Sequence, residues 1–519
     1  MAKPRPWLLP AALAGVALLG LPTVFLPFGR DQGFFASVAR AANDGGVIYR
    51  DAWDIKPPMI YWIYAIAQAV FGQTTRAAHW ADLASVLATC ALLYALMKRL
   101  FAPGVGVLAA LLYGAWYFLA LDYWNLAQAE GFLGLAFAAA ALSLVIAAET
   151  DRADWAAVGG AWLGVAFLLK TTALLYAAAS PLVLLVMANG RSFVRTIRLV
   201  AFSAAGFLAP CALAAAYFAM AGAWRPFLDV YAVVLPGYWT LPGSGNRAFL
   251  PAHLRFFGLN AWVPVLGAAA LLLARWSGNV RRTLVVLGLA ALSMAGVWLQ
   301  RKYFLYHWVA AFGPLACLAA LGAGNFVEFA SGRGRPAAWA ARVAIAVLLA
   351  ATSVATVQRY LGQTELVWAE RAGRIDRTTF EKRFGLPDEG DFYLPYVTGL
   401  ADAVRQGTPR GATIYLWGFD PLLYFLADRD PASRFVGAPH VYSDWAPARW
   451  RNELTEALLR RRPAVFVVDE VHDYYWVTGN HQTGREALDG FPEVRTMLDR
   501  DYRAIAPFGP YRVYGRRVP

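Results

Sequence analysis

The residues from Gly29 to Trp62 combine charged and aromatic side chains directly after an uninterrupted apolar run. The run from Pro6 to Phe28 holds no charged residue and is long enough to cross a bilayer, which takes about 20 residues for roughly 30 Å of hydrocarbon. Carboxylates, a lysine and aromatic rings at one membrane edge suit a reaction on a charged, lipid-borne substrate. The side chains concerned are Arg30, Asp31, Asp51, Asp54 and Lys56, with Tyr49, Trp53, Tyr61 and Trp62 among them.

Two helices are expected to hold this charged loop. Apolar residues recur at helical spacing over 32–43, which predicts an amphipathic helix lying along the membrane surface. Asp44-Gly45-Gly46 is a turn signal, and Pro57-Pro58 forces an extended or turn backbone. Met59 to Phe71 is predicted as a second interfacial helix, so the charged residues would sit on a rigid scaffold at the depth of the lipid headgroups.

The composition is that of a multi-span membrane protein. Of 519 residues, 59% are hydrophobic and 16% are charged, below the roughly 25% charged residues of soluble proteins. Cys90, Cys211 and Cys317 lie in apolar segments and are expected to be small buried hydrophobes. The first run exceeds the core of a cleavable signal and is predicted as the first of about 11 transmembrane helices. The apolar runs are 7–28, 77–97, 105–121, 126–148, 155–169, 172–189, 199–221, 259–275, 283–299, 304–322 and 340–357.

The basic residues indicate the orientation of these spans. With the N-terminus inside, nearly every cytoplasmic connection is basic, as the positive-inside rule requires. The net charge of +13 is then largely an orientation signal, and no nucleic-acid partner is expected. The pair 155–169 and 172–189 could instead be one long broken helix. The basic connections contain Lys3 and Arg5, Lys98 and Arg99, Arg152, Arg191 to Arg198, Arg275 to Arg282 and Arg333 to Arg342.

This register divides the chain into a membrane domain, 1–357, whose first outer loop is 29–76, and an extracytoplasmic domain, 358–519. In the second domain, 413–418, 464–470 and 511–515 are predicted as short buried strands, with helices at 394–406 and 447–461. A small α/β domain results. Its histidines and aspartates show no ligand spacing, and we expect it to shape access of the acceptor rather than to perform chemistry.

Three segments together resemble a known family. The first is Y-x-D-x-W-D-x-KPP-x-x-YW at 49–62, the second is RKYFLYHWVAAFGPLACLAALG at 301–322, and the third is GFDPLLYFLADRDPASRF at 418–435. They are similar to segments of the GT-C membrane glycosyltransferases. That group includes the protein O-mannosyltransferases, the aminoarabinose transferases of lipid A and the RgtA/B/C/D-like bacterial transferases.

The resemblance implies transfer of a sugar from a polyprenyl-phosphate carrier to an acceptor hydroxyl, usually with inversion, at the outer membrane face. Asp31 matches the family's acidic residue after the first helix and would be the general base. Its structural alternative is the N-cap of the helix 32–43. Lys56 matches the family's KPP lysine, which is expected to contact the carrier phosphate, although interfacial lysines also snorkel without such a role.

Further residues are assigned to donor or substrate binding. Lys170, Arg301 and Lys302 are expected to add positive charge at the donor phosphate, with interfacial anchoring as the alternative for the last two. Glu130 and His307 are ionisable residues within spans, which favours a functional role. Glu130 could replace the acidic partner that Asp31 lacks, bind sugar or acceptor hydroxyls, or be a buried carboxylate paired with Lys170 or His307. In many family members a Glu follows the first-loop Asp, but here Gln32 does, which makes protein mannosylation less favoured.

The loop 222–258 is aromatic and rich in Pro and Gly. Tyr231, Tyr238, Trp239 and Arg247 could cover bound substrates, and Tyr61 of the first loop is also expected at the substrate. The alternative for the loop is an aromatic interfacial belt without a catalytic role.

Other functions stay open. A ligase or polymerase that moves whole oligosaccharides would share the topology and the lipid-phosphate chemistry. A transporter is less favoured, because no internal repeat is present and the polar residues gather at one outer face. Asp31, Asp51, Asp54 and Glu130 could bind a metal, but basic side chains for the phosphate favour a reaction without a metal or cofactor. The resemblance places the protein in a bacterial inner membrane, with a polyprenyl-phosphate sugar donor, a glycan, lipid or protein acceptor, and membrane lipids as partners.

Overall fold

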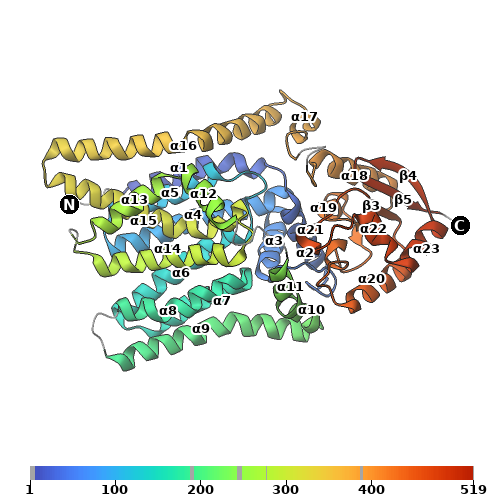
Figure 1. Ribbon diagram of the computed structural model, residues 1–519, viewed down its shortest axis with the longest axis horizontal. Coiled ribbons are helices and arrows are strands. Elements are labelled where there is room, and N and C mark those ends of the chain that lie inside the picture. Colours follow the sequence, from blue (N-terminus) through green and yellow to red (C-terminus); the bar gives the residue numbers. More distant parts are fainter. Residues whose placement is uncertain (1–5, 188–191, 242–247, 276–277, 386–389, 518–519) are drawn as a thin grey trace. The chain divides into compact units, whose positions relative to one another are not determined.

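The computed structural model describes residues 6–187, 192–241, 248–275, 278–385 and 390–517 (Figure 1). The chain forms two compact units. One, the helical unit, comprises Met1–Phe25, His79–Ala214 and Ser244–Glu365. The other, the mixed unit, comprises Leu26–Ala78, Ala215–Gly243 and Leu366–Pro519. The segment 29–76, predicted as the first outer loop, therefore clusters with the C-terminal segment, while the expected domain boundary at residue 357 stays a prediction.

The helical unit is a bundle of apolar helices that run along roughly a common direction (Figure 1). Small residues let neighbouring helices approach closely, as is usual in membranes. A Cβ atom at Gly160 would clash with the backbone of Ser203, and one at Gly322 with the backbone of Leu266. The elements are α1 (Leu8–Gly20), η1 (Leu21–Phe25), α4 (Thr75–Leu100), α5 (Pro103–Ala120), α6 (Ala129–Thr150), α7 (Ala153–Leu169), η2 (Thr171–Ala173), α8 (Leu174–Met187), α9 (Phe193–Met220), α12 (Phe249–Leu259), α13 (Trp262–Leu272), α14 (Val280–Gln300), η5 (Leu305–Trp308), α15 (Val309–Ser331) and α16 (Arg335–Arg371).

The predicted spans coincide with helices, but not all of these helices are long. Within the described residues, eight helices are long and apolar enough to cross a membrane. The pair α12 and α13, bent by 88°, makes a ninth if it is one span. The difference from about 11 lies in α7 and in η2 with α8, which are apolar but shorter than 18 residues. These two segments are the pair that the sequence analysis left open as one long broken helix.

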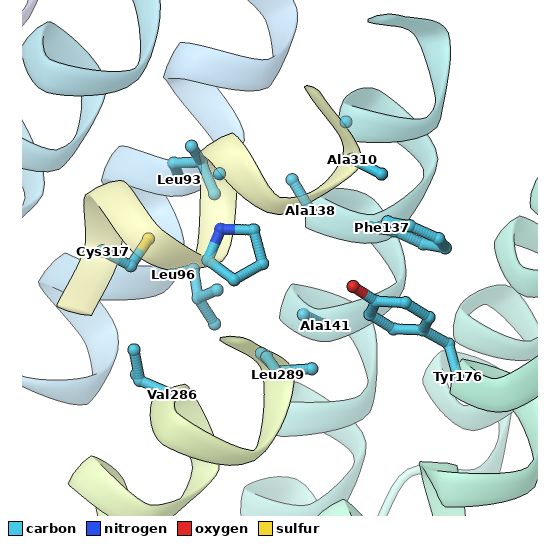
Figure 2. Close-up of a pocket in the computed structure, with 13 residues that line it drawn as sticks. Leu93, Leu96, Phe137, Ala138, Ala141, Tyr176, Val286, Leu289, Ala310 and Cys317 are labelled. Atoms are coloured by element: carbon cyan, nitrogen blue, oxygen red, sulfur yellow. The ribbon is translucent and has the colours of Figure 1, made fainter. Parts of the chain in front are cut away.

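A small apolar cavity lies between α4, α6, α8, α14 and α15 (Figure 2). Its volume is about 20 Å³, and its lining includes Leu93, Phe137, Tyr176, Leu289 and Cys317. An apolar cavity of this size lacks the polar partners that would hold a water molecule. The expectation that Cys90 and Cys317 are buried hydrophobes is confirmed, and Cys211 is half-buried.

The mixed unit is an α/β structure. Its five strands are β1 (Thr413–Trp417), β2 (Asp430–Pro431), β3 (Val465–Asp469), β4 (Tyr502–Phe508) and β5 (Tyr511–Arg516), in the order β2-β1-β3-β5-β4. Strands β2, β1 and β3 are parallel, and β5 and β4 are antiparallel to their neighbours. The three predicted strands are confirmed as β1, β3 and β5.

Helices of the mixed unit come from three parts of the sequence. The predicted helices 394–406 and 447–461 are confirmed as α18 and α20. Within the described residues these helices are α2 (Arg30–Asn43), α3 (Met59–Phe71), α10 (Trp224–Asp229), η3 (Val230–Val234), α11 (Leu235–Thr240), α17 (Arg377–Glu381), α18 (Leu394–Gly407), α19 (Leu422–Ala427), η6 (Ala438–His440), α20 (Ala448–Arg461), α21 (Tyr475–Thr478), α22 (Gly484–Asp489) and α23 (Pro492–Asp501).

The helix α2 is buried rather than laid along a surface. Every residue from 32 to 40 is buried, and α2 packs on α3 and α19. Gly33 permits this contact, because a Cβ atom there would lie 2.7 Å from Leu422. The Ser37 hydroxyl donates a hydrogen bond to the carbonyl of Pro421 at 2.8 Å. The helix itself was predicted correctly, but its expected exposed position is wrong. Its small residues allow another helix to pack against the face that was expected to be polar.

A buried arginine fixes the start of α2. Arg30 is 1% exposed, and its Nε donates to Asp420 Oδ1 at 2.9 Å. Its Nη1 donates to Asp391 Oδ2 at 2.7 Å, and Nη2 donates to the Asp391 carbonyl. The guanidinium also lies 5.3 Å from the ring centroids of Phe419 and Tyr474. Such a planar, many-donor cation suits a site with two carboxylates and aromatic faces.

A second arginine fixes the other end of the same helix. Arg40 Nη2 donates to Asp430 Oδ1 at 2.7 Å and to the carbonyl of Arg429 at 2.8 Å. Because both ends of α2 are bound by charged hydrogen bonds to the segment 391–430, sliding the helix by one turn would leave two guanidinium groups buried without partners.

Removal of one partner of Arg30 is expected to destabilise the protein strongly. Asp420→Asn leaves a buried guanidinium with one remaining carboxylate, which should cost about 3 kcal/mol and lower the apparent Tm of the purified protein by about 5 °C or more. Asp499→Asn is the matched control, because Asp499 is 67% exposed in its pair with Arg495 and should change the Tm little. Equal Tm values for the two variants would contradict the role of the buried pair.

Candidate functional site

Asp31 lies in the first turn of α2, directly after the buried Arg30. The N-cap of α2 is Gly29, whose N–H donates to Gln32 Oε1 at 3.2 Å. The alternative role of Asp31 as the N-cap is therefore wrong, because the helix begins two residues earlier than the pattern suggested. Asp31 is half-buried, and its carboxylate sits at the positive end of the helix dipole.

Lys56 is held by its main chain. Its N–H donates to the hydroxyl of Tyr61 at 3.1 Å, and its carbonyl accepts from the hydroxyl of Tyr49 at 2.7 Å. The Tyr61 hydroxyl donates in turn to Asp54 Oδ2 at 2.8 Å. These three contacts bracket the turn before Pro57-Pro58, so the position of the lysine is set by two buried tyrosines and one buried carboxylate.

The carboxylate of Asp54 is electrostatically unusual. Burial raises its pKa to about 6, against the lowering effects of the Ile55 N–H, Tyr61 and Lys56, while the charge of Asp31 raises it slightly. Burial, and next the charges of Asp31 and Asp54, raise the pKa of Tyr238 from α11. Asp31, Asp54, Lys56, Tyr61 and Tyr238 are thus electrostatically coupled within the mixed unit. We call them the loop cluster.

The membrane cluster belongs to the helical unit and consists of Glu130, Lys170 and His307. Glu130 lies in the first turn of α6, Lys170 is the C-cap of α7, and His307 lies in η5 before α15. Lys170 Nζ forms an ion pair with Glu130 Oε1, and His307 Nε2 lies 3.9 Å from the same oxygen. The Glu130 side chain is 0% exposed. The pairing of this carboxylate with Lys170 and His307, one of the two alternatives for it, is present.

Arg301 and Lys302 lie between α14 and η5, and both are half-buried. Arg301 and Tyr303 have φ values of 56° and 52°, a conformation that non-glycine residues adopt rarely. Burial, and next the charge of Arg301, lower the pKa of Lys302 to about 8. A lysine of this kind loses its charge more readily than an exposed one unless an anion is bound beside it.

Two further residues, Trp239 and Arg247, were expected to cover the bound substrates. Trp239 is 48% exposed at the end of α11. Arg247 lies outside the described residues.

Sequence reasoning missed two acids with strong contacts. Asp82 is buried in α4 and accepts from the Tyr117 hydroxyl at 2.6 Å, in the helical unit. An acid in the otherwise apolar stretch after His79 could have identified it. Asp229, in the mixed unit, forms an ion pair with Arg449 and accepts from Trp450 Nε1 at 3.1 Å. No local signal in 222–258 pointed to this partner, which lies about 220 positions away.

Among the residues that the structure describes, no group of three or more His, Cys, Asp or Glu side chains is placed to hold a metal ion.

Comparison with known proteins gives one family model and several structures. The model described as dolichyl-phosphate-mannose-protein mannosyltransferase matches residues 55–217. ArnT from Cupriavidus metallidurans bound to undecaprenyl phosphate superposes with a TM-score of 0.61 at 16% identity, covering 98% of each chain. The apo oligosaccharyltransferase of Archaeoglobus fulgidus gives a TM-score of 0.53 at 14% identity, covering 99% of this chain and 75% of that one. No curated protein sequence matches the chain.

The chain has the GT-C fold of membrane glycosyltransferases.

The resemblance drawn from the first loop is confirmed at this level. The family model covers about a third of the GT-C chain and includes Lys56, Tyr61, Glu130 and Lys170. Asp31 lies before the matched residues, and the loop 300–303 lies after them. The family model therefore gives no support for the roles of these residues, and only the geometry of the site bears on them.

The raised pKa of Asp54 predicts a pH-dependent contribution to stability. Between its ordinary pKa near 3.8 and the folded value of about 6, the native state binds more protons than the unfolded state. The contribution of Asp54 therefore falls as the pH rises from about 4 to about 6. Asp54→Asn should gain stability relative to the wild type over this range, by at most about 3 kcal/mol.

The measurement is the Tm of both proteins from pH 4 to 7.5. Asp51→Asn is the control of opposite sign. Burial raises the pKa of Asp51, but hydrogen bonds from Arg50 and the Val47 N–H outweigh this and hold it below its usual value. Asp51 therefore stabilises above pH 4, and its loss should give a flat, unfavourable difference. A flat difference for Asp54→Asn as well would show that Asp54 titrates normally.

Proposed function

We propose that the protein transfers a sugar from a polyprenyl-phosphate donor to a hydroxyl group of an envelope lipid, polysaccharide or protein. The observation that carries this proposal is the loop cluster, in which Asp31 and Lys56 both act electrostatically on Asp54, and two buried tyrosines hold the main chain of Lys56. This pairing provides a base for the acceptor and a cation for the donor phosphate. The undecaprenyl phosphate bound to the similar ArnT supports a donor of this class.

The reaction is a single displacement with inversion. Asp31 takes the proton of the acceptor hydroxyl as its oxygen forms a bond to the anomeric carbon. The bond from that carbon to the phosphate oxygen breaks, and the carrier phosphate leaves with the electron pair. Lys56, with Lys170, Arg301 and Lys302, stabilises the negative charge that gathers on the phosphate. Glu130, His307, Tyr61 and Tyr238 bind the sugar or the acceptor.

The setting proposed for this reaction is a bacterial plasma membrane, with Asp31 and the C-terminal segment on the extracytoplasmic side. Nine crossings among the described residues, with α12 and α13 taken as one span, give the odd number that this orientation needs, and the positive-inside pattern of their connections supports it as well.

Transfer of a whole oligosaccharide is a second candidate, because the archaeal oligosaccharyltransferase has a related fold. The single sugar is favoured, since ArnT matches over nearly its full length whereas a quarter of the oligosaccharyltransferase chain has no counterpart here. Mass spectrometry of envelope lipids and polysaccharides from a deletion strain would separate the two by the mass that is lost.

Asp31→Asn should abolish transfer while donor binding persists, because the amide cannot accept the acceptor proton. A loss of about 100-fold or more in kcat is expected for a general base. The assay is sugar transfer by the purified protein in nanodiscs. Asp44→Asn is the matched control, because Asp44 is exposed at the other end of α2. Wild-type kcat in Asp31→Asn would remove its assignment.

Lys56→Ala should weaken the use of the donor. Loss of the cation at the phosphate should raise the KM for the donor about tenfold, with a smaller effect on the acceptor. Lys98→Ala, an exposed lysine at the end of α4, serves as the control. An unchanged donor KM in Lys56→Ala would exclude a contact with the phosphate.

A further inference from the structure

Two buried acceptor atoms at the start of α6 have no hydrogen-bond donor among the described residues. They are Glu130 Oε2 and Gln128 Oε1, and the two side chains are 0% and 1% exposed. Gln128 is the N-cap residue of α6, and Glu130 follows in its first turn. Buried acceptors without donors destabilise a fold, so each requires a donor from water or from a ligand.

The orientation of both groups is fixed by their other atoms. Gln128 Nε2 donates to the carbonyl of Trp124 at 3.0 Å, which leaves Oε1 as the available end of the amide. Glu130 Oε1 is bound by Lys170 and lies 3.9 Å from His307 Nε2, which leaves Oε2 as the available oxygen. The site therefore offers two acceptors and lacks a donor of its own for them.

The charge of the site selects the kind of donor. One ammonium group already neutralises Glu130, and an imidazole lies beside it. A second ammonium group would meet the ammonium group of Lys170 in a poorly hydrated space, where like charges repel strongly. A hydroxyl group donates a hydrogen bond without adding charge, so hydroxyl groups suit the two acceptors and an amino group does not.

We propose that Gln128 and Glu130 form a subsite for hydroxyl groups of the transferred sugar, and that the sugar carries no amino group where they bind it. The proposal rests on the proposed function, in which Lys170 contacts the donor phosphate. The sugar is attached directly to that phosphate. Because Lys170 is in contact with Glu130, a phosphate bound by Lys170 brings the hydroxyl groups of the attached sugar to the carboxylate.

The test measures binding rather than turnover. Full-length protein in nanodiscs is titrated with undecaprenyl phosphate alone and with undecaprenyl phosphate carrying glucose, mannose, arabinose or 4-amino-4-deoxyarabinose. The wild type should bind the best neutral sugar about tenfold more tightly than the bare lipid phosphate, and more tightly than the amino sugar. In Gln128→Met most of this gain should be lost, while the affinity for undecaprenyl phosphate is unchanged.

Gln68→Met is the matched control, because Gln68 is a buried glutamine of α3 whose Nε2 and Oε1 both have partners. It should leave the gain from the sugar as in the wild type. A full gain in Gln128→Met, or tighter binding of 4-amino-4-deoxyarabinose than of arabinose, would overturn the subsite. If the bare lipid phosphate binds but no sugar adds affinity, water fills the site and the subsite alone fails. If undecaprenyl phosphate itself does not bind, the proposed function fails with it.

Discussion

The contact of Arg30 with Asp420 and Asp391 is the constraint on which the mixed unit depends. Asp420 follows β1, and Asp469 ends the neighbouring parallel strand β3. In open α/β sheets, the carboxyl ends of parallel strands are where ligands bind. Here the guanidinium of Arg30, at the start of α2, binds Asp420 beside this edge, so the sheet holds a side chain of its own chain at that point. Asp31 is the next residue, and its place is fixed by the same contact.

The two carboxylates share the arginine unequally. Burial raises the pKa of Asp391, but the charge and hydrogen bond of Arg30 outweigh it and hold the pKa below its usual value. Asp420 is fully buried, and burial keeps its pKa raised despite Arg30 and the hydroxyl of Tyr511. A buried pair of this kind adds little net stability over apolar packing, but breaking it is costly. Its effect is to specify one placement of α2, which the proposed role of Asp31 as general base requires.

Features that arise from residues close together in the sequence were predicted, whereas features that arise from contacts between distant residues were not. The apolar runs and the strands β1, β3 and β5 follow from local periodicity, and all were predicted. The burial of α2 was not, because Asp420 lies 390 positions from Arg30 and no local pattern pairs them. In the loop cluster, Lys56 and Tyr61 were chosen from a motif, whereas the raised pKa of Asp54 arises from burial that only the folded chain reveals. The pairing of Glu130 with Lys170 was one of two open alternatives.

That pairing does not reduce Glu130 to a structural residue. A contact between α6 and α7 could be made as well by apolar side chains, since the desolvation of a buried ion pair largely offsets its attraction. Moreover, an ion pair kept only for packing would have both carboxylate oxygens bound, whereas Oε2 has no donor within the described structure. Lys170 lowers the cost of holding a carboxylate in an apolar bundle, and the second oxygen remains available to accept a hydrogen bond. In the proposed subsite, the ion pair with Lys170 and the binding of a sugar hydroxyl would therefore use the two different oxygens of Glu130.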